Sequence, residues 1–230
     1  MESLKILISL IVFALFLSAG VVNSVSADEK KGKALAESKK CGSCHKLQGP
    51  PDKTIADVLK RKAPDLFYSG SKFKKEWLEG FLQKPTMIRP AGTVYLNNIK
   101  MGEKKDEIGD VKPCASALSK DEAHEVTEYL MTLKEPTMKT GVIVDDKFSK
   151  AKAKVLFGQK EGCSGCHRDK ADSGGTSCPT LYNAGERLNP DWVFDFLKNP
   201  QKYDPKIWMP RRELSDEDFM LLAKLIASMK

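Results

Sequence analysis

Apolar residues recur at helical spacing near the end of each half of the chain. In residues 118–134 they are Val126, Tyr129, Leu130 and Leu133, and in residues 214–230 they are Phe219, Leu222, Leu225 and Met229. Each stretch opens with a serine that acidic residues follow, which is typical of a helix N-terminus. The pattern predicts two amphipathic helices, with Ser119 and Ser215 as their N-caps.

A longer stretch of the chain occurs twice. Residues 63–85, APDLFYSGSKFKKEWLEGFLQKP, match residues 178–200, CPTLYNAGERLNPDWVFDFLKNP, at a constant offset of 115 without a gap. The two final helices match at an offset of 96, so the first copy contains 19 extra residues. The chain is therefore a duplication of one unit.

Each unit predicts the same order of elements. A short helical stretch is followed by a cysteine-rich motif, a loop to a proline, a helix around a tryptophan, a further loop and the final helix. Since no convincing alternating strand pattern appears, we expect a mainly α fold of two small helical bundles in tandem. The predicted domains are residues 28–135, with an insertion at 86–113, and residues 147–230, joined by a linker at 136–146.

The N-terminus has the pattern of an export signal. Lys5 precedes an apolar run over residues 6–19, and small residues end at Ala27, directly before a charged segment. This predicts a signal peptide over residues 1–27 and a mature protein in the periplasm or an equivalent extracytoplasmic compartment. An uncleaved membrane anchor is the alternative for this segment, and no other stretch is apolar enough to span a bilayer.

The net charge bears on the kind of partner, and the cysteine count shows which cysteines lie outside the repeated motif. The formal net charge is +7, and the lysines are scattered through both halves. No nucleic-acid motif is present, so an acidic redox partner or a membrane surface fits this charge better, and ordinary solubilising charge is the simplest reading. Four of the six cysteines belong to the repeated motif, which leaves Cys114 and Cys178.

The repeated motif is CxxCH, read as CGSCH at 41–45 and CSGCH at 163–167. Two thiols three positions apart can form thioethers with the vinyl groups of one haem, and the adjacent histidine can bind the iron. We therefore predict two covalently bound haem c groups. One is attached through Cys41 and Cys44 with His45 as iron ligand, and the other through Cys163 and Cys166 with His167.

Three other uses of these cysteines fit the sequence less well. A zinc site would need the two CxxC pairs to converge, although they lie in separate copies of the repeat. A thioredoxin-like pair would need a βαβ context, which the sequence lacks. A disulfide framework explains neither the histidines nor the duplication.

On these motifs each half resembles a class I cytochrome c domain, and the chain resembles the tandem-domain di-haem cytochromes c of bacterial periplasms. The resemblance implies that Pro64 and Pro179 supply backbone carbonyls to the imidazole N–H groups of the two haem histidines. It also implies a methionine as second axial ligand shortly before the last helix. In the second half Met209, followed by Pro210, matches that pattern.

The first half departs from the family pattern at this ligand. Counting back from the shared final helix brings Cys114 to within one place of the ligand position. Met101 is the alternative, and other ligands or an open site also stay open. A Cys114–Cys178 disulfide would remove the thiolate, although Cys178 is explained more simply as a small buried residue.

The resemblance implies transfer of single electrons between redox protein partners, with a His/Met second haem and a His/Cys first haem. A thiolate lowers the reduction potential relative to a methionine sulfur. The alternatives are a di-haem oxidoreductase of the thiosulfate dehydrogenase type and a sensor of small gases such as NO or CO. Between enzyme and carrier the sequence favours a non-enzymatic carrier, and it leaves the oligomeric state open.

Overall fold

The computed structural model describes residues 27–104 and 106–230. The predicted signal peptide lies outside the described residues except for Ala27, which is the first residue of helix α2. The prediction of a mainly α fold is confirmed. Within the described part of the chain, none of the helices is both long and apolar enough to cross a membrane.

Within residues 27–104 and 106–135 the α-helices of the first half are α2 (Ala27–Ser38), α3 (Ile55–Leu59), α4 (Ser69–Lys72), α5 (Lys75–Gln83) and α6 (Lys120–Thr132). The second half contains α7 (Lys150–Val155), which the π-helical turn η3 (Leu156–Lys160) continues, and then α8 (Ala184–Arg187), α9 (Pro190–Lys198), α10 (Pro200–Tyr203) and α11 (Asp216–Ala227). Short 3₁₀ turns are η1 (Cys41–Ser43), η2 (Tyr95–Asn98) and η4 (Cys163–Gly165).

Local hydrogen bonds explain where the long helices begin. The Ser119 hydroxyl accepts from the Glu122 N–H at 3.3 Å, and the Glu122 carboxylate accepts from the Ser119 N–H at 3.0 Å, which together form a capping box. Ser215 likewise accepts from the Asp218 N–H at 3.1 Å at the start of α11. Both predicted serine N-caps are confirmed.

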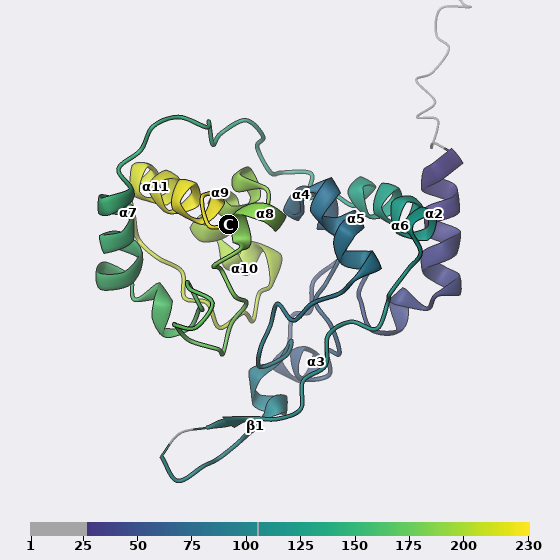
Figure 1. The fold of residues 1–230 in the computed structure, drawn as a ribbon, viewed down its shortest axis with the longest axis horizontal. Coiled ribbons are helices and arrows are strands. Elements are labelled where there is room, and N and C mark those ends of the chain that lie inside the picture. The colour runs from purple at the N-terminus through teal and green to yellow at the C-terminus, as the bar shows by residue number, and fades with distance from the viewer. Residues whose placement is uncertain (1–26, 105) are drawn as a thin grey trace, which may run out of the picture.

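Each half has its own hydrophobic core. In the first half α6 packs on α2, α4 and α5, and the buried residues include Leu78, Val126 and Leu130. In the second half α11 packs on α7, α8 and α9, and the buried residues include Trp192 and Leu222. Figure 1 shows the two halves side by side, with α4 and α8 between them.

Two glycines allow the short helix of each half to approach the final helix closely. The Gly70 N–H donates to the Leu133 carbonyl, and the Gly185 N–H donates to the Met229 carbonyl, both at 2.8 Å. A Cβ atom on Gly70 or Gly185 would lie 2.1 Å from a carbonyl oxygen of the final helix. These contacts join residues that are equivalent in the two copies. The two copies of the repeat therefore also pack in the same way.

The two halves meet through a contact with approximate two-fold symmetry. Phe73 and Leu188, which are equivalent at the offset of 115, face each other in an isolated antiparallel bridge. The Lys74 N–H donates to the Arg187 carbonyl at 2.9 Å, and the Asn189 N–H donates to the Lys72 carbonyl at 2.8 Å. Since each bond is the symmetry equivalent of the other, the interface has the isologous form of a homodimer.

The linker predicted at residues 136–146 is held against the second half. The Asp191 carboxylate, in the first turn of α9, accepts from the N–H groups of Gly141, Val142 and Ile143 at 2.6, 2.9 and 2.8 Å. The side chains of Met138 and Ile143 pack on the second core. This segment therefore packs against the second half.

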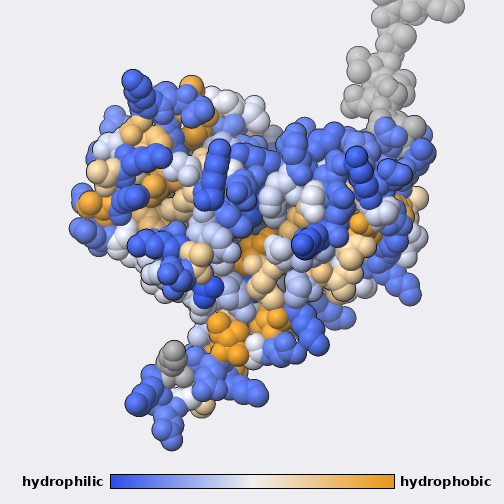
Figure 2. Space-filling model, in the orientation of Figure 1, coloured by the Kyte–Doolittle hydropathy of each residue, from blue (hydrophilic) through white to orange (hydrophobic). Residues whose placement is uncertain are grey.

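The insertion of the first half contains a hairpin that the sequence did not reveal. Strands β1 (Ile99–Lys100) and β2 (Glu107–Ile108) pair antiparallel, and the hairpin projects from the body (Figure 1). Two-residue strands are too short to display an alternating pattern, which explains why no strand was predicted. Figure 2 shows hydrophobic residues gathered where the hairpin joins the body, and exposed apolar side chains there include Leu96 of η2.

Candidate functional site

The two CxxCH segments have the same backbone conformation. A residue in the left-handed region precedes each motif, namely Lys40 with φ 56° and Gly162 with φ 63°. A 3₁₀ turn follows, in which the His45 N–H donates to the Cys41 carbonyl and the His167 N–H donates to the Cys163 carbonyl, both at 3.0 Å. The turn brings the two thiols and the imidazole of each motif close together in the fold.

A proline carbonyl orients each histidine. The Nδ1 atom of His45 lies 2.7 Å from the Pro64 oxygen, and that of His167 lies 2.7 Å from the Pro179 oxygen. A carbonyl only accepts hydrogen bonds, so the proton is on Nδ1 and the Nε2 lone pair remains available to a metal. Burial is the main cause of the lowered pKa of His167, which favours this neutral form.

Cys114 lies beside His45. A hydrogen bond with the His45 side chain is the main cause that lowers the pKa of the Cys114 thiol to about 7, while burial opposes this shift and Ser116 supports it. Cys114 also contributes to the raised pKa of Cys41, behind the larger effect of burial. Met101, the alternative ligand, is 93 % exposed and directly follows β1. Only Cys114 of the two candidates is therefore near His45.

Met209 lies in the loop before α11, partly buried, and packs against the same core cluster as Cys163. Its carbonyl accepts a hydrogen bond from the Gln201 side-chain amide at 3.1 Å, so α10 fixes the backbone at this position. The repeat places Met209 in the second half where the first half has the Pro113–Cys114 segment.

All six cysteines are free, so Cys114 and Cys178 are not joined. Cys178 instead lies beside the second CxxCH motif, where its N–H donates to the Cys166 carbonyl at 3.1 Å. Burial is the main cause that raises the pKa of its thiol. Among residues 27–104 and 106–230, no group of three or more His, Cys, Asp or Glu side chains could hold a metal ion, so the two CxxC pairs do not converge on a zinc site.

Buried donors of the second half fit the carboxylate groups of a haem. Arg187 is 3 % exposed, and its Nε atom has no hydrogen-bond partner among the described residues, while its Nη2 atom donates to the Thr180 carbonyl. The indole Nε1 atom of buried Trp192 is likewise without a partner in that part of the chain. Because unpaired buried donors are costly, a ligand with two carboxylates is a suitable acceptor for them.

Lys72, the equivalent of Arg187 in the first half, lies at the interface between the halves. Its ammonium lies 5.5 Å from the ring centre of Tyr68, 5.1 Å from that of Phe73 and 4.9 Å from that of Trp192. Burial, with smaller effects of Arg89 and Arg187, lowers the pKa of Lys72 to about 7. The sequence reasoning missed both buried cations, although a basic residue at the same repeat position was a signal for them.

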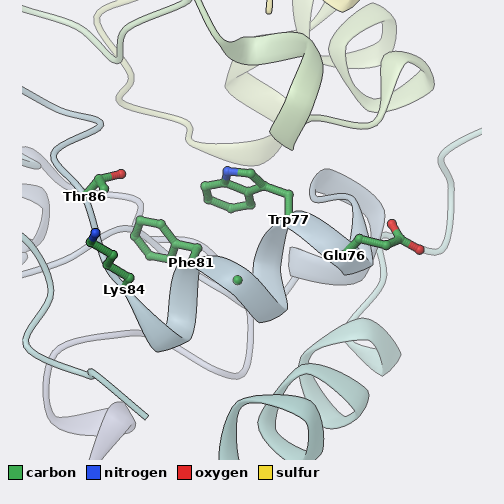
Figure 3. A pocket seen from close by; sticks show the side chains of 6 residues that line it. Glu76, Trp77, Phe81, Lys84 and Thr86 are labelled. Carbon is green, nitrogen blue, oxygen red and sulfur yellow. The ribbon is translucent and has the colours of Figure 1, made fainter. Parts of the chain in front are cut away.

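A shallow groove in the first half has a covered counterpart in the second. Glu76, Trp77, Gly80, Phe81, Lys84 and Thr86 line a groove of about 340 Å³ along α5 (Figure 3). In the second half the equivalent rings, Trp192 and Phe196, lie 5.6 and 5.7 Å from the ring of Tyr203 of α10. The two copies therefore differ at this face.

Comparison with known proteins gives one match. The model of the cytochrome c family matches residues 29–134 and 150–230, one segment in each half. No curated protein and no solved structure matches the chain.

Proposed function

Because the chain belongs to the cytochrome c family, we propose that it is a di-haem c-type cytochrome that carries single electrons between redox partners outside the cytoplasm. Thioethers from Cys41 and Cys44 would hold one haem, and thioethers from Cys163 and Cys166 the other. The haem supplies the chemistry, a one-electron exchange between ferric and ferrous iron. The protein binds, orients and shields it.

The observation that carries this proposal is the matched geometry of the two motifs. Two segments far apart in the sequence adopt the same left-handed residue and 3₁₀ turn, and each histidine lies 2.7 Å from a proline carbonyl. Such a bond fixes the ring orientation and makes the imidazole a better electron donor to iron. A structural turn without a cofactor would not require this in both halves.

We further propose different second ligands in the two halves, Cys114 in the first and Met209 in the second. The position of Cys114 beside His45 supports the first assignment, since two ligands of one iron must face each other. The loop position of Met209 before the final helix supports the second. A thiolate favours ferric iron and a neutral thioether favours ferrous iron, so the first site would have the lower potential.

The mass of the denatured protein tests the attachment. We expect the polypeptide without residues 1–27 plus two porphyrins, and a mass that exceeds the polypeptide by fewer than two would refute the proposal. A larger polypeptide with its leader intact would refute cleavage after Ala27 and favour the uncleaved membrane anchor instead.

Electron paramagnetic resonance of the oxidised protein tests the ligands. Thiolate-ligated low-spin haem has a compressed spread of g values, which we expect in the wild type and in Met101→Ala but not in Cys114→Ala. Met101→Ala is the matched control, because it removes the other candidate ligand of the first half. Loss of the signature in Met101→Ala with its retention in Cys114→Ala would reverse the assignment.

The position of Cys114 beside His45 favours a second candidate function, binding of a small gas such as NO or CO at the first site. The bond between ferrous iron and a cysteine ligand is weak, so a diatomic gas can displace it. Anaerobic titration of the reduced protein with CO should then shift one of two Soret bands. If neither band moves, this function is excluded. Reduction of the haems by added thiosulfate would instead favour an oxidoreductase.

A further inference from the structure

The two halves exchange charged side chains across their symmetric interface. Arg89 and Asp204 each lie four residues after the proline, Pro85 or Pro200, that ends the matched stretch of its copy. The segment that contains each residue crosses to the other half. The two side chains have opposite charges.

Asp204 enters the first half. Its carboxylate accepts from the Arg61 guanidinium at 2.5 Å (Nη1) and 3.4 Å (Nη2). Arg61 also pairs with Asp52 at 2.6 Å and with buried Asp65 at 3.6 Å. Asp65 directly follows Pro64, the residue that holds His45. Asp204 is therefore part of the charged network behind the first histidine.

Arg89 enters the second half. The carbonyl of Ile88 accepts from the Thr180 N–H at 2.8 Å, which fixes this segment against the residue that follows Pro179. Pro179 holds His167. Thr180 directly follows Pro179, so the bond to Ile88 places the Arg89 segment next to the backbone that orients His167. Arg89 is thus close to the second histidine, although it belongs to the first half.

The charges near the two histidines differ in sign. Behind His45 three carboxylates share two cations: Asp52, Asp65 and Asp204 with Lys46 and Arg61. Arg89 and Arg187 lie near His167, and Lys72 lies at the interface between the halves; burial lowers the pKa of Lys72 and of Arg187, and Arg89 lowers both further. None of these three forms an ion pair with a carboxylate in residues 27–104 and 106–230.

We propose that this exchange orders the reduction potentials of the two sites. Arg89 raises the potential of the second site, Asp204 lowers that of the first, and an electron that enters the protein settles in the second half. The reason is electrostatic, since a nearby cation disfavours the additional positive charge of ferric iron and a nearby anion favours it. This inference rests on the proposed di-haem function.

Spectroelectrochemical titration of the holoprotein tests the exchange. The long-wavelength band of the His/Met haem reports the second site, and the thiolate signature in frozen samples reports the first. Arg89→Gln should lower the ferrous-to-ferric ratio of the second site at fixed potential by about three- to tenfold, where tenfold corresponds to about 59 mV for one electron. Asp204→Asn should raise the ratio of the first site by a similar factor.

Two further variants complete the test. Arg89→Lys keeps the charge and should retain most of the wild-type potential. Lys139→Gln removes one positive charge from an exposed position in the linker and is the matched control for net charge. We expect it to change the second-site ratio by less than about twofold, because exposed charges are screened by solvent and salt.

The outcomes separate the inference from the function on which it rests. If Arg89→Gln and Asp204→Asn keep two porphyrins by mass but move neither potential beyond the Lys139→Gln control, the exchange of charges is refuted. A wild-type protein with fewer than two porphyrins would refute the di-haem function itself. If Arg89→Gln does not fold, Asp204→Asn and Arg89→Lys still decide the inference.

Discussion

Replacing Gly185 by alanine should destabilise the second half strongly. The added Cβ would lie 2.1 Å from the Ala227 oxygen, 2.6 Å from its carbonyl carbon and 2.8 Å from the Met229 oxygen. All three are backbone atoms, so no side-chain rotation relieves the contact. An ordinary contact begins at 3.4 Å, which requires α8 and α11 to separate by about 1.3 Å.

The expected fall in the free energy of unfolding has two contributions. Separation weakens the packing of Leu222, Leu225 and Ile226 of α11, and forced overpacking of a core costs about 1–3 kcal/mol. It also weakens the 2.8 Å bond from Gly185 to the Met229 carbonyl, which contributes about 1 kcal/mol. We therefore expect the free energy of unfolding of the second half to fall by about 2–4 kcal/mol.

Equilibrium urea unfolding of the holoprotein measures this change. Circular dichroism should follow it together with haem absorbance, because the two halves can unfold in separate steps. Gly80→Ala is the matched control, since a Cβ at this exposed position in α5 meets nothing within 4 Å. It should stabilise the protein by up to about 1 kcal/mol. The reasoning is wrong if Gly185→Ala lies within about 0.5 kcal/mol of wild type.

Three further changes test local features. Ser119→Ala removes the capping box of α6 and should cost about 1 kcal/mol in urea unfolding, more than Ser215→Ala if the reciprocal Glu122 bond contributes. Lys40→Gly removes a left-handed non-glycine residue and should raise the free energy of unfolding by about 1 kcal/mol, whereas Gly162→Ala should lower it similarly. Hydrogen bonds from Lys46 and Arg61 lower the pKa of Asp52, so its stabilising effect is present above the ordinary carboxyl pKa and disappears as the pH falls through the lowered value. Asp52→Asn should therefore destabilise the protein at pH 7, and the difference from wild type should disappear as the pH falls through the lowered pKa. Unfolding curves that show a constant difference across pH would contradict this.

The helices could be predicted because their signals are local. Apolar spacing and serine caps lie within one element, and Ser119 and Ser215 were found from them alone. The hairpin at residues 99–108 could not be predicted in this way, because its strands are held by pairing across a turn. The short helices α4 and α8 have too few residues to display a period.

Some residues of the candidate site could likewise be predicted from the sequence, and others could not. The CxxCH motifs were visible because haem attachment requires these residues at that spacing, and the duplication doubled the signal. The two prolines were indicated by the family resemblance. Counting back from the final helix indicated Cys114, which the fold brings beside His45. The buried cations Lys72 and Arg187 and the partly buried Arg89 were missed, since their surroundings are made by contacts between distant parts of the chain.

The bridge between Phe73 and Leu188 has a consequence for how the two copies could diverge. In an assembly of two identical subunits, every substitution near the axis appears on both sides, so a pair of unlike residues can never form at equivalent positions. Covalent fusion removes that restriction. Phe73 and Leu188 themselves show this freedom, because two different residues stand at equivalent positions of the repeat and face each other.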